Sequence, residues 1–246
     1  MTSILLFFIL ALNMAHAETK LLMVGGGNRP AAAMAEFVKA AGSGNSSLLV
    51  IPWASESFES AEVIKKELLL SRPGKVEVIV DRDDLKNKIQ NATGIFFTGG
   101  DQNKLMKEIL DSGTYILMRE QFHKGVVFGG TSAGTAIMSD PMLSGSADLT
   151  VIDGNKTELV KGLGLLPTHI IVDQHFIMRQ RFNRLAGLIL GLKDHVGIGV
   201  DENTALFITD NQAVVMGPTQ VLVFKQIEKN NLSVKMYFEG EKFLLQ

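Results

Sequence analysis

One serine of this chain lies in a setting that is typical of a catalytic nucleophile. Ser132 is at the centre of Gly130-Thr131-Ser132-Ala133-Gly134, which matches the pattern Gly-x-Ser-x-Gly. A nucleophile at a sharp strand-to-helix turn has a strained backbone, so its neighbours must lack bulk. Residues 126–128 predict the strand and residues 133–138 predict the short helix. Ser132 is therefore a candidate nucleophile; the alternative is a glycine-rich turn in which Ser132 caps the helix.

Two backbone N–H groups are candidates for an oxyanion hole. Ala133 begins the predicted helix, so its N–H lies at the positive end of the helix dipole. The run Gly99-Gly100-Asp101-Gln102 also ends a predicted strand, residues 94–98, and begins a helix. Because glycines allow close backbone approach, an N–H near Gly100 is expected to complete the hole. Asp101 as a helix N-cap explains the same sequence, and both interpretations can hold together.

A serine hydroxyl is a weak nucleophile and needs a general base. Four histidines follow residue 17, at positions 123, 169, 175 and 195. His175 comes directly after the apolar residues 170–172, and functional residues gather at the carboxyl ends of parallel strands. His169, in a predicted loop, is the main competitor. His123 and His195 lie among lysines at expected element ends, where surface histidines are common.

A carboxylate is expected to orient the base. Glu202 is the candidate because it follows the predicted strand 196–200. Asp173 and Asp201 are rivals, and an ordinary polar turn over residues 201–203 accounts for the same sequence without any role in catalysis.

Three arginines follow His175 closely, at positions 179, 181 and 184. Arg181 and Arg184 are three residues apart and share a helix face, whereas Arg179 points elsewhere in a regular helix. Guanidinium groups suit carboxylate binding through paired hydrogen bonds. Together with a carboxylate such as Asp173, the cluster is suited to recognise an acidic substrate. For any single arginine, a solvated helix face is the alternative.

The elements that position these residues predict an α/β fold with a mostly parallel sheet between helices. Apolar strands without polar alternation are expected at 20–24, 47–51, 76–80, 94–98 and 126–128. Helices are expected at 30–41, 58–70, 81–91, 101–110 and 114–123. Short strands at 196–200, 205–208, 213–216, 221–224, 233–238 and 243–245 are expected to add antiparallel strands to the same sheet. Without a linker or repeat, residues 18–246 are predicted to form a single domain.

Composition narrows the class of protein. The chain has 246 residues, 46% hydrophobic and 20% charged, with a formal net charge of −2. These values indicate a globular protein without a basic surface for nucleic acid. No cysteine is present, which excludes disulfides, thiolate metal ligands and a cysteine nucleophile. No His/Asp cluster has the spacing of metal ligands, so no metal or other cofactor is expected.

The first residues are typical of an export signal. Residues 4–12 are apolar but too short to span a bilayer, and Ala15-His16-Ala17 suits signal peptidase. We expect a signal peptide at residues 1–17 and a periplasmic or secreted protein that begins at Glu18. A buried first element of the fold is the alternative. No later apolar run is long enough for a membrane helix, so stable membrane insertion is not expected.

Five segments together resemble one family, the cyanophycinases and the related aspartyl dipeptidases (dipeptidase E). The segments occur in the family order and span most of residues 18–246. They are Gly25-Gly26-Gly27-Asn28-Arg29-Pro30, Phe97-Thr98-Gly99-Gly100-Asp101-Gln102, Gly130-Thr131-Ser132-Ala133-Gly134, Asp173-Gln174-His175-Phe176 with the three arginines, and Gly197-Ile198-Gly199-Val200-Asp201-Glu202-Asn203-Thr204-Ala205.

The resemblance implies a fold like that of the class I glutamine amidotransferases, with serine in place of the usual cysteine. It implies a catalytic triad of Ser132, His175 and Glu202, and an acyl-enzyme on Ser132. It also implies substrate contacts from Gln102, Asp173, Gln174, Arg179, Arg181 and Arg184.

Gln-His followed by three arginines is more similar to the cyanophycinases, which release β-aspartyl-arginine units from a polymer. Carboxylates such as Asp173 would hold the guanidinium of such a substrate, and arginines would hold its aspartyl carboxylate. The expected partner is thus a peptide or a cyanophycin-like polymer, and the resemblance also suggests a homodimer. An α-aspartyl dipeptidase and a non-catalytic exported binding protein of the same fold are the alternatives.

Overall fold

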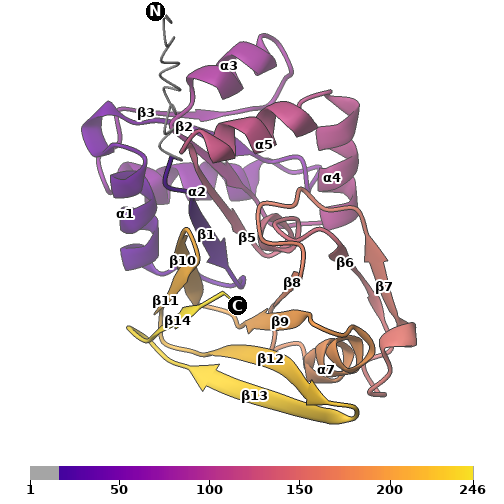
Figure 1. Ribbon diagram of the computed structural model, residues 1–246. Helices are drawn as coiled ribbons and strands as arrows, with labels where there is room; N and C mark the ends of the chain where they lie inside the picture. The colour runs from indigo at the N-terminus through magenta and orange to yellow at the C-terminus, as the bar shows by residue number, and fades with distance from the viewer. Residues whose placement is uncertain (1–16, 246) are drawn as a thin grey trace, which may run out of the picture.

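A computed structural model describes residues 17–245 of the chain. The predicted signal peptide, residues 1–17, lies outside the described residues except for Ala17. Within the described part, an eight-stranded sheet forms the centre of the fold (Figure 1). Its strands, in spatial order, are β14 (Lys242–Leu244), β11 (Gln212–Met216), β10 (Ala205–Thr209), β1 (Lys20–Val24), β5 (Val127–Thr131), β4 (Gly94–Phe97), β2 (Ser47–Ile51) and β3 (Lys75–Val78).

Helices cover both faces of this sheet, because residues that alternate along β1 join different cores. Leu22 and Val24 pack with the helices of one face, and Leu21 and Met23 with those of the other. The first face carries α1 (Ala31–Ala40) and α2 (Glu59–Leu69), and the second carries α3 (Leu85–Asn91), α4 (Gln102–Asp111), α5 (Tyr115–His123) and α6 (Ala133–Ala136). Burial on both faces explains the strands without polar alternation, and the predicted α/β fold is confirmed.

The later strands divide between two sheets. β10, β11 and β14 extend the central sheet beyond β1, as expected, and each of them is antiparallel to the strand before it in the sheet. The expectation was wrong for the strands at 196–200, 221–224 and 233–238, which belong to a second sheet. This sheet consists of β8 (Ile170–Gln174), β9 (Val196–Val200), β12 (Val221–Glu228) and β13 (Asn231–Tyr237). The reason is a parallel β8–β9 pair, connected by α7 (Phe182–Gly191). Leu185 and Ile189 of α7 pack with Phe224 in a separate apolar cluster.

A hairpin between residues 142 and 160 was not predicted. It consists of β6 (Met142–Ala147) and β7 (Thr157–Val160), whose register shifts between Leu143 and Ala147. Serine and glycine occupy the shifted part and have low β-propensity, so the sequence carries little strand signal there. Short 3₁₀ turns lie at Ser43–Asn45 and Gly154–Lys156. The helix expected over 81–91 begins only at Leu85, because Asp84 has a positive φ of 54°.

The carboxyl ends of several strands meet at one edge of the central sheet. Val24 pairs with Thr131, and Phe97 pairs with Gly130, so β1, β4 and β5 end together. The segment after β8 is tied to the same edge, since the N–H of residue 175 donates to the Gly25 carbonyl at 2.7 Å. The segment after β9 is tied there as well, through a 2.9 Å bond from the N–H of residue 203 to the carbonyl of residue 26. This edge positions the candidate site.

Candidate active site

Ser132 lies at a strained turn between β5 and α6. Its backbone has φ 53° and ψ −112°, a conformation that L-residues rarely adopt. Its N–H donates to the Val24 carbonyl at 3.0 Å, which fixes the turn against β1. A side chain at Gly130 would lie 2.4 Å from the backbone of Gly134, and one at Gly134 would lie 2.5 Å from the carbonyl oxygen of Phe97. The two glycines therefore allow the close approach that the sequence pattern predicts.

The structure brings Ser132, His175 and Glu202 into one hydrogen-bonded line. Nε2 of His175 lies 2.7 Å from Oγ of Ser132, and Nδ1 lies 2.5 Å from Oε1 of Glu202. With the Nδ1 proton donated to Glu202, Nε2 is left as an acceptor for the hydroxyl proton. This arrangement is able to pass a proton from the serine to the imidazole.

Burial favours the neutral form of His175. The side chain is removed from water, which lowers its pKa below the usual 6.5; the hydrogen bond that it donates to Glu202 acts in the opposite direction, and the charge of Arg179 adds to the lowering. A histidine with a lowered pKa is unprotonated at pH 7. His175 is thus able to accept a proton at neutral pH.

The loop after β1 forms a cradle for the imidazole, a role that the sequence did not assign to its glycines. A methyl group at Gly26 would lie 2.1 Å from Cε1 and 2.5 Å from Nε2 of His175. At Gly27, it would lie 3.2 Å from Oε2 of Glu202. Both glycines have positive φ, of 117° and 65°. Three glycines directly after a strand are the signal for such a close approach.

Replacing Gly26 by alanine is expected to lower kcat/KM at least about 10²-fold, because the new methyl group displaces the base from the serine. Gly240→Ala is the matched control: Gly240 also has a positive φ, 83°, but open space around it. Hydrolysis rates and circular dichroism of both variants separate displacement of the ring from general backbone strain. A folded Gly26→Ala protein with wild-type activity would contradict the cradle.

The two turns that carry the N–H groups predicted for an oxyanion hole lie at the serine. Ala133 is the first residue of α6, so its N–H has no acceptor within the helix. A side chain at Gly99 would lie 3.3 Å from Cβ of Ser132. Gly100, with φ 142°, is held against Ala54, whose carbonyl accepts from the N–H of the next residue at 2.8 Å. Their role in catalysis stays a prediction.

Most of the expected substrate contacts are bonded within the protein. Asp173 is 1% exposed, and its two oxygens accept from Arg184. Nη1 of Arg181 lies 3.4 Å from Asp173 and donates to the carbonyl of Gln174 at 2.7 Å. Burial lowers the pKa of Arg181 to about 10. This carboxylate is therefore occupied by protein arginines, and a substrate guanidinium would have to displace them.

The remaining predicted contacts differ in exposure. Arg179 is exposed, and no ion pair of its guanidinium is recorded in residues 17–245. Gln174 places Oε1 3.5 Å from the Ser132 hydroxyl. Gln102 is buried, and its amide donates to the Leu143 carbonyl at 3.1 Å. Gln174 thus lies at Ser132, and Arg179 is close enough to affect the charge of His175, whereas Gln102 holds β6.

The alternative candidates for the base and its orienting carboxylate make contacts away from Ser132. Asp201 accepts from the N–H groups of Ile177 and Met178 at 2.9 and 3.0 Å, so it caps the turn after His175. The carbonyl of His169 accepts from Val196, and the ring of His195 contacts the carbonyl of Lys193. Neither histidine is hydrogen-bonded to Ser132.

Comparison with known proteins identifies the family. The pattern of peptidase family S51 matches residues 21–216. The chain belongs to this family. A cyanophycinase of Nostoc sp. is 30% identical to it over 227 residues, or 86% of this chain and 75% of the relative. A peptidase E of Salmonella arizonae is 27% identical over 149 residues, or 57% of this chain and 62% of the relative.

Solved structures agree with the S51 fold. A peptidase from an acI-B1 Actinobacterium has a TM-score of 0.71 and 20% identity, and the match covers 94% of this chain and 98% of that one. A putative peptidase E of Listeria monocytogenes has a TM-score of 0.62 and 20% identity, with 82% and 100% covered. The resemblance seen in the sequence is thus confirmed, and as an S51 member the chain is a peptidase that acts on a peptide.

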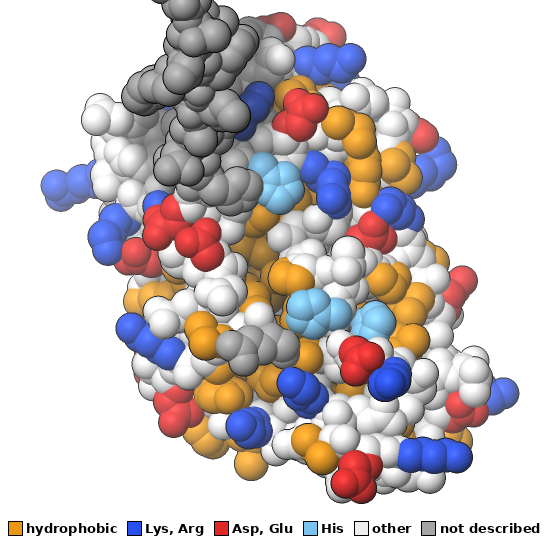
Figure 2. All heavy atoms as spheres, viewed as in Figure 1, with side chains coloured by type: hydrophobic (Ala, Val, Ile, Leu, Met, Phe, Trp, Pro, Cys, Tyr) orange, Lys and Arg blue, Asp and Glu red, His pale blue; other side chains and the backbone are white. Residues whose placement is uncertain are grey.

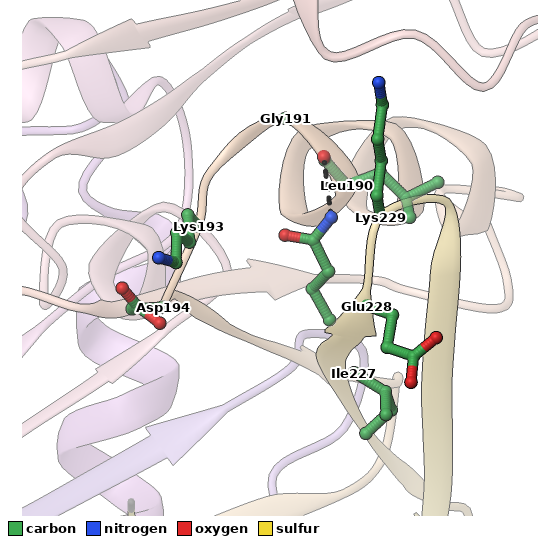
Figure 3. A pocket seen from close by; sticks show the side chains of 8 residues that line it. Leu190, Gly191, Lys193, Asp194, Ile227, Glu228 and Lys229 are labelled. Carbon is green, nitrogen blue, oxygen red and sulfur yellow. Dashed lines mark hydrogen bonds between the residues drawn. The ribbon is translucent and has the colours of Figure 1, made fainter.

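A pocket of about 440 Å³ lies between the end of α7 and the β12–β13 turn (Figure 3), and Ser132 is not among the residues that line it. Charged side chains of both signs are interspersed over the face in Figure 2. Among residues 17–245, no group of three or more His, Asp or Glu side chains is arranged to hold a metal ion. None of the helices in this range has the length and apolar character needed to cross a bilayer.

Proposed function

We propose that this chain is a serine-type exopeptidase that hydrolyses aspartyl peptide bonds, of the β-aspartyl-arginine type, through an acyl-enzyme on Ser132. The observation that supports it is the line of hydrogen bonds from Ser132 Oγ through His175 to Glu202. A neutral imidazole beside the hydroxyl and a carboxylate behind the imidazole are what nucleophilic catalysis by serine requires.

The reaction proceeds in two stages. Nε2 of His175 takes the hydroxyl proton as Oγ of Ser132 bonds to the scissile carbonyl carbon, and N–H groups of Gly100 and Ala133 stabilise the oxyanion. The imidazolium then gives this proton to the leaving amine, which departs and leaves an ester on Ser132. Water, deprotonated by His175, releases the acyl group. Glu202 orients the ring and stabilises its charged form throughout.

The charges beside the serine favour a substrate with a carboxylate. Asp173, Arg181 and Arg184 form a buried group with one negative and two positive charges. Exposed Arg179 adds a further positive charge close enough to lower the pKa of His175. We assign the aspartyl carboxylate to Arg179 and Arg181, while Arg184 holds Asp173.

The kind of aspartyl linkage is proposed from the relatives. The longer match, to a cyanophycinase, favours a β-aspartyl-arginine substrate over an α-aspartyl dipeptide. Export through residues 1–17 remains part of the proposal and would direct the enzyme to external polymer or peptides.

Product analysis tests the proposal. Residues 18–246 are incubated with cyanophycin, with β-aspartyl-arginine peptides and with α-aspartyl dipeptides, and the products are separated by liquid chromatography. We expect β-aspartyl-arginine from the polymer and much slower cleavage of the α-linked peptides. Cleavage of α-aspartyl dipeptides alone would establish the dipeptidase instead. Binding without hydrolysis of any substrate would support a non-catalytic protein.

A further inference from the structure

The strand β6 contains a bulge whose carbonyl groups face two helices of the site. Leu143 pairs with Leu159, but the next pair joins Ala147 to Thr157, so three residues of β6 oppose one of β7. Such a bulge bends a strand and leaves part of its backbone without ladder partners. Bonds from other elements must then satisfy the carbonyls.

Three side chains supply those bonds to three consecutive carbonyls. Gln102 donates to Leu143 at 3.1 Å and Asn103 donates to Ser144 at 3.1 Å. Arg184 donates to Gly145 at 3.3 Å.

The donors belong to two different helices, α4 and α7. Gln102 and Asn103 form the first turn of α4, directly after the Gly99-Gly100 turn beside Ser132. Arg184 belongs to α7 and binds Asp173, which precedes Gln174 and His175. The bulge therefore joins the oxyanion turn to the strand that carries the base.

We propose that the bulge, residues 144–146, forms a wall of the substrate cleft and that Asn103 is the residue that positions it. Asn103 suits this role because its backbone is already fixed: its N–H donates to the N-cap Asp101 at 2.7 Å. Its side-chain amide thus starts from a rigid point and reaches Ser144, the first residue of the bulge. The Ser144 hydroxyl donates to Glu158 of β7 at 2.7 Å, which holds the other side of the bulge.

Asn103 acts on substrate binding, not on the chemistry at Ser132. Its amide holds one backbone carbonyl and is not part of the line from Ser132 to Glu202. Replacing it leaves the serine and histidine in place but frees the wall. This inference rests on the proposed function where it concerns KM, whereas the mobility of the bulge is measurable without turnover.

The test compares Asn103→Asp and Asn103→Ser with Asn91→Asp. Asn103→Asp removes the amide donor and places a carboxylate next to the Ser144 carbonyl. In Asn103→Ser, the side chain is too short to reach that carbonyl. Asn91→Asp is the matched control, because the Asn91 amide also donates to a backbone carbonyl, that of Asn87, but on exposed α3. We expect both Asn103 variants to raise KM about five- to tenfold, the effect of one lost hydrogen bond, with kcat changed less than twofold.

Hydrogen–deuterium exchange provides a second, independent readout. Amides of residues 143–147 should exchange faster than in wild type in both Asn103 variants. Their exchange rates in Asn91→Asp should equal those of wild type. Equal KM and equal exchange in wild type and Asn103 variants would overturn the inference, as would a loss confined to kcat. If the wild type hydrolyses no aspartyl peptide, the proposed function fails. The role of Asn103 in positioning the bulge is then decided by exchange alone, and equal exchange in wild type and the Asn103 variants would reject it.

Discussion

Ser132→Ala is expected to lower kcat on the order of 10⁶-fold, the typical cost of removing a nucleophile from a catalytic serine site. The hydroxyl oxygen lies 2.7 Å from Nε2 of His175, and the chain offers no cysteine to replace it. Ala133 and Gly134 follow in the same turn, so a methyl group at position 132 fits without new contacts. Loss of activity should therefore occur in a folded protein.

The measurement is the initial rate of aspartyl peptide hydrolysis, with mass spectrometry of protein treated with a fluorophosphonate. Wild type should gain one adduct, on Ser132, and Ser132→Ala should gain none. Ser71→Ala is the control for a serine-to-alanine change remote from the site, because Ser71 follows α2 on the other face of the central sheet. Hydrolysis by Ser132→Ala within tenfold of the wild-type rate would exclude the serine mechanism.

Glu202→Gln is expected to lower kcat by about 10⁴-fold, with little change in structure. Oε1 of Glu202 lies 2.5 Å from Nδ1 of His175 and accepts a hydrogen bond from its N–H. An amide at this place is able to donate to Nδ1, which moves the ring proton to Nε2 and leaves no acceptor for the serine hydroxyl. In other serine triads, the change from carboxylate to amide has an effect of this size because it selects the wrong tautomer.

Proton NMR of the histidine ring separates this cause from a structural one. Wild type should show a downfield Nδ1 proton, which Glu202→Gln should lose. Asp201→Asn is the neighbouring control, since the Asp201 carboxylate accepts from the N–H groups of Ile177 and Met178 and, within residues 17–245, has no hydrogen bond to the imidazole. The assignment of Glu202 would be rejected if Asp201→Asn, and not Glu202→Gln, removed the activity.

Features that depend on local sequence were predictable. Gly130 and Gly134 signal the turn at Ser132 because each lies where any side chain would overlap backbone. His175 and Glu202 were indicated by their positions after apolar strands, since parallel strands bring their ends to one edge. Their hydrogen bonds to each other are a finding of the structure, and their catalytic roles stay predictions.

Features that depend on distant partners were not predictable. The sequence shows Asp173, Arg181 and Arg184 as charges, but not that they pair with one another in a buried group. The bulge of β6 lacks a strand signal because its bonds come from side chains on α4 and α7. The division of later strands between two sheets depends on how α7 packs, which short apolar runs do not reveal.

The carbonyls of Gly25 and Gly26 accept from the backbone N–H groups of residues 175 and 203, so the loop after β1 and two segments far along the chain build the site together. β1 takes its place between β5 and β10 only after some two hundred residues have been synthesised. A growing or truncated chain thus carries the serine without an aligned base. The aligned site is therefore expected only in a chain that has folded through β10.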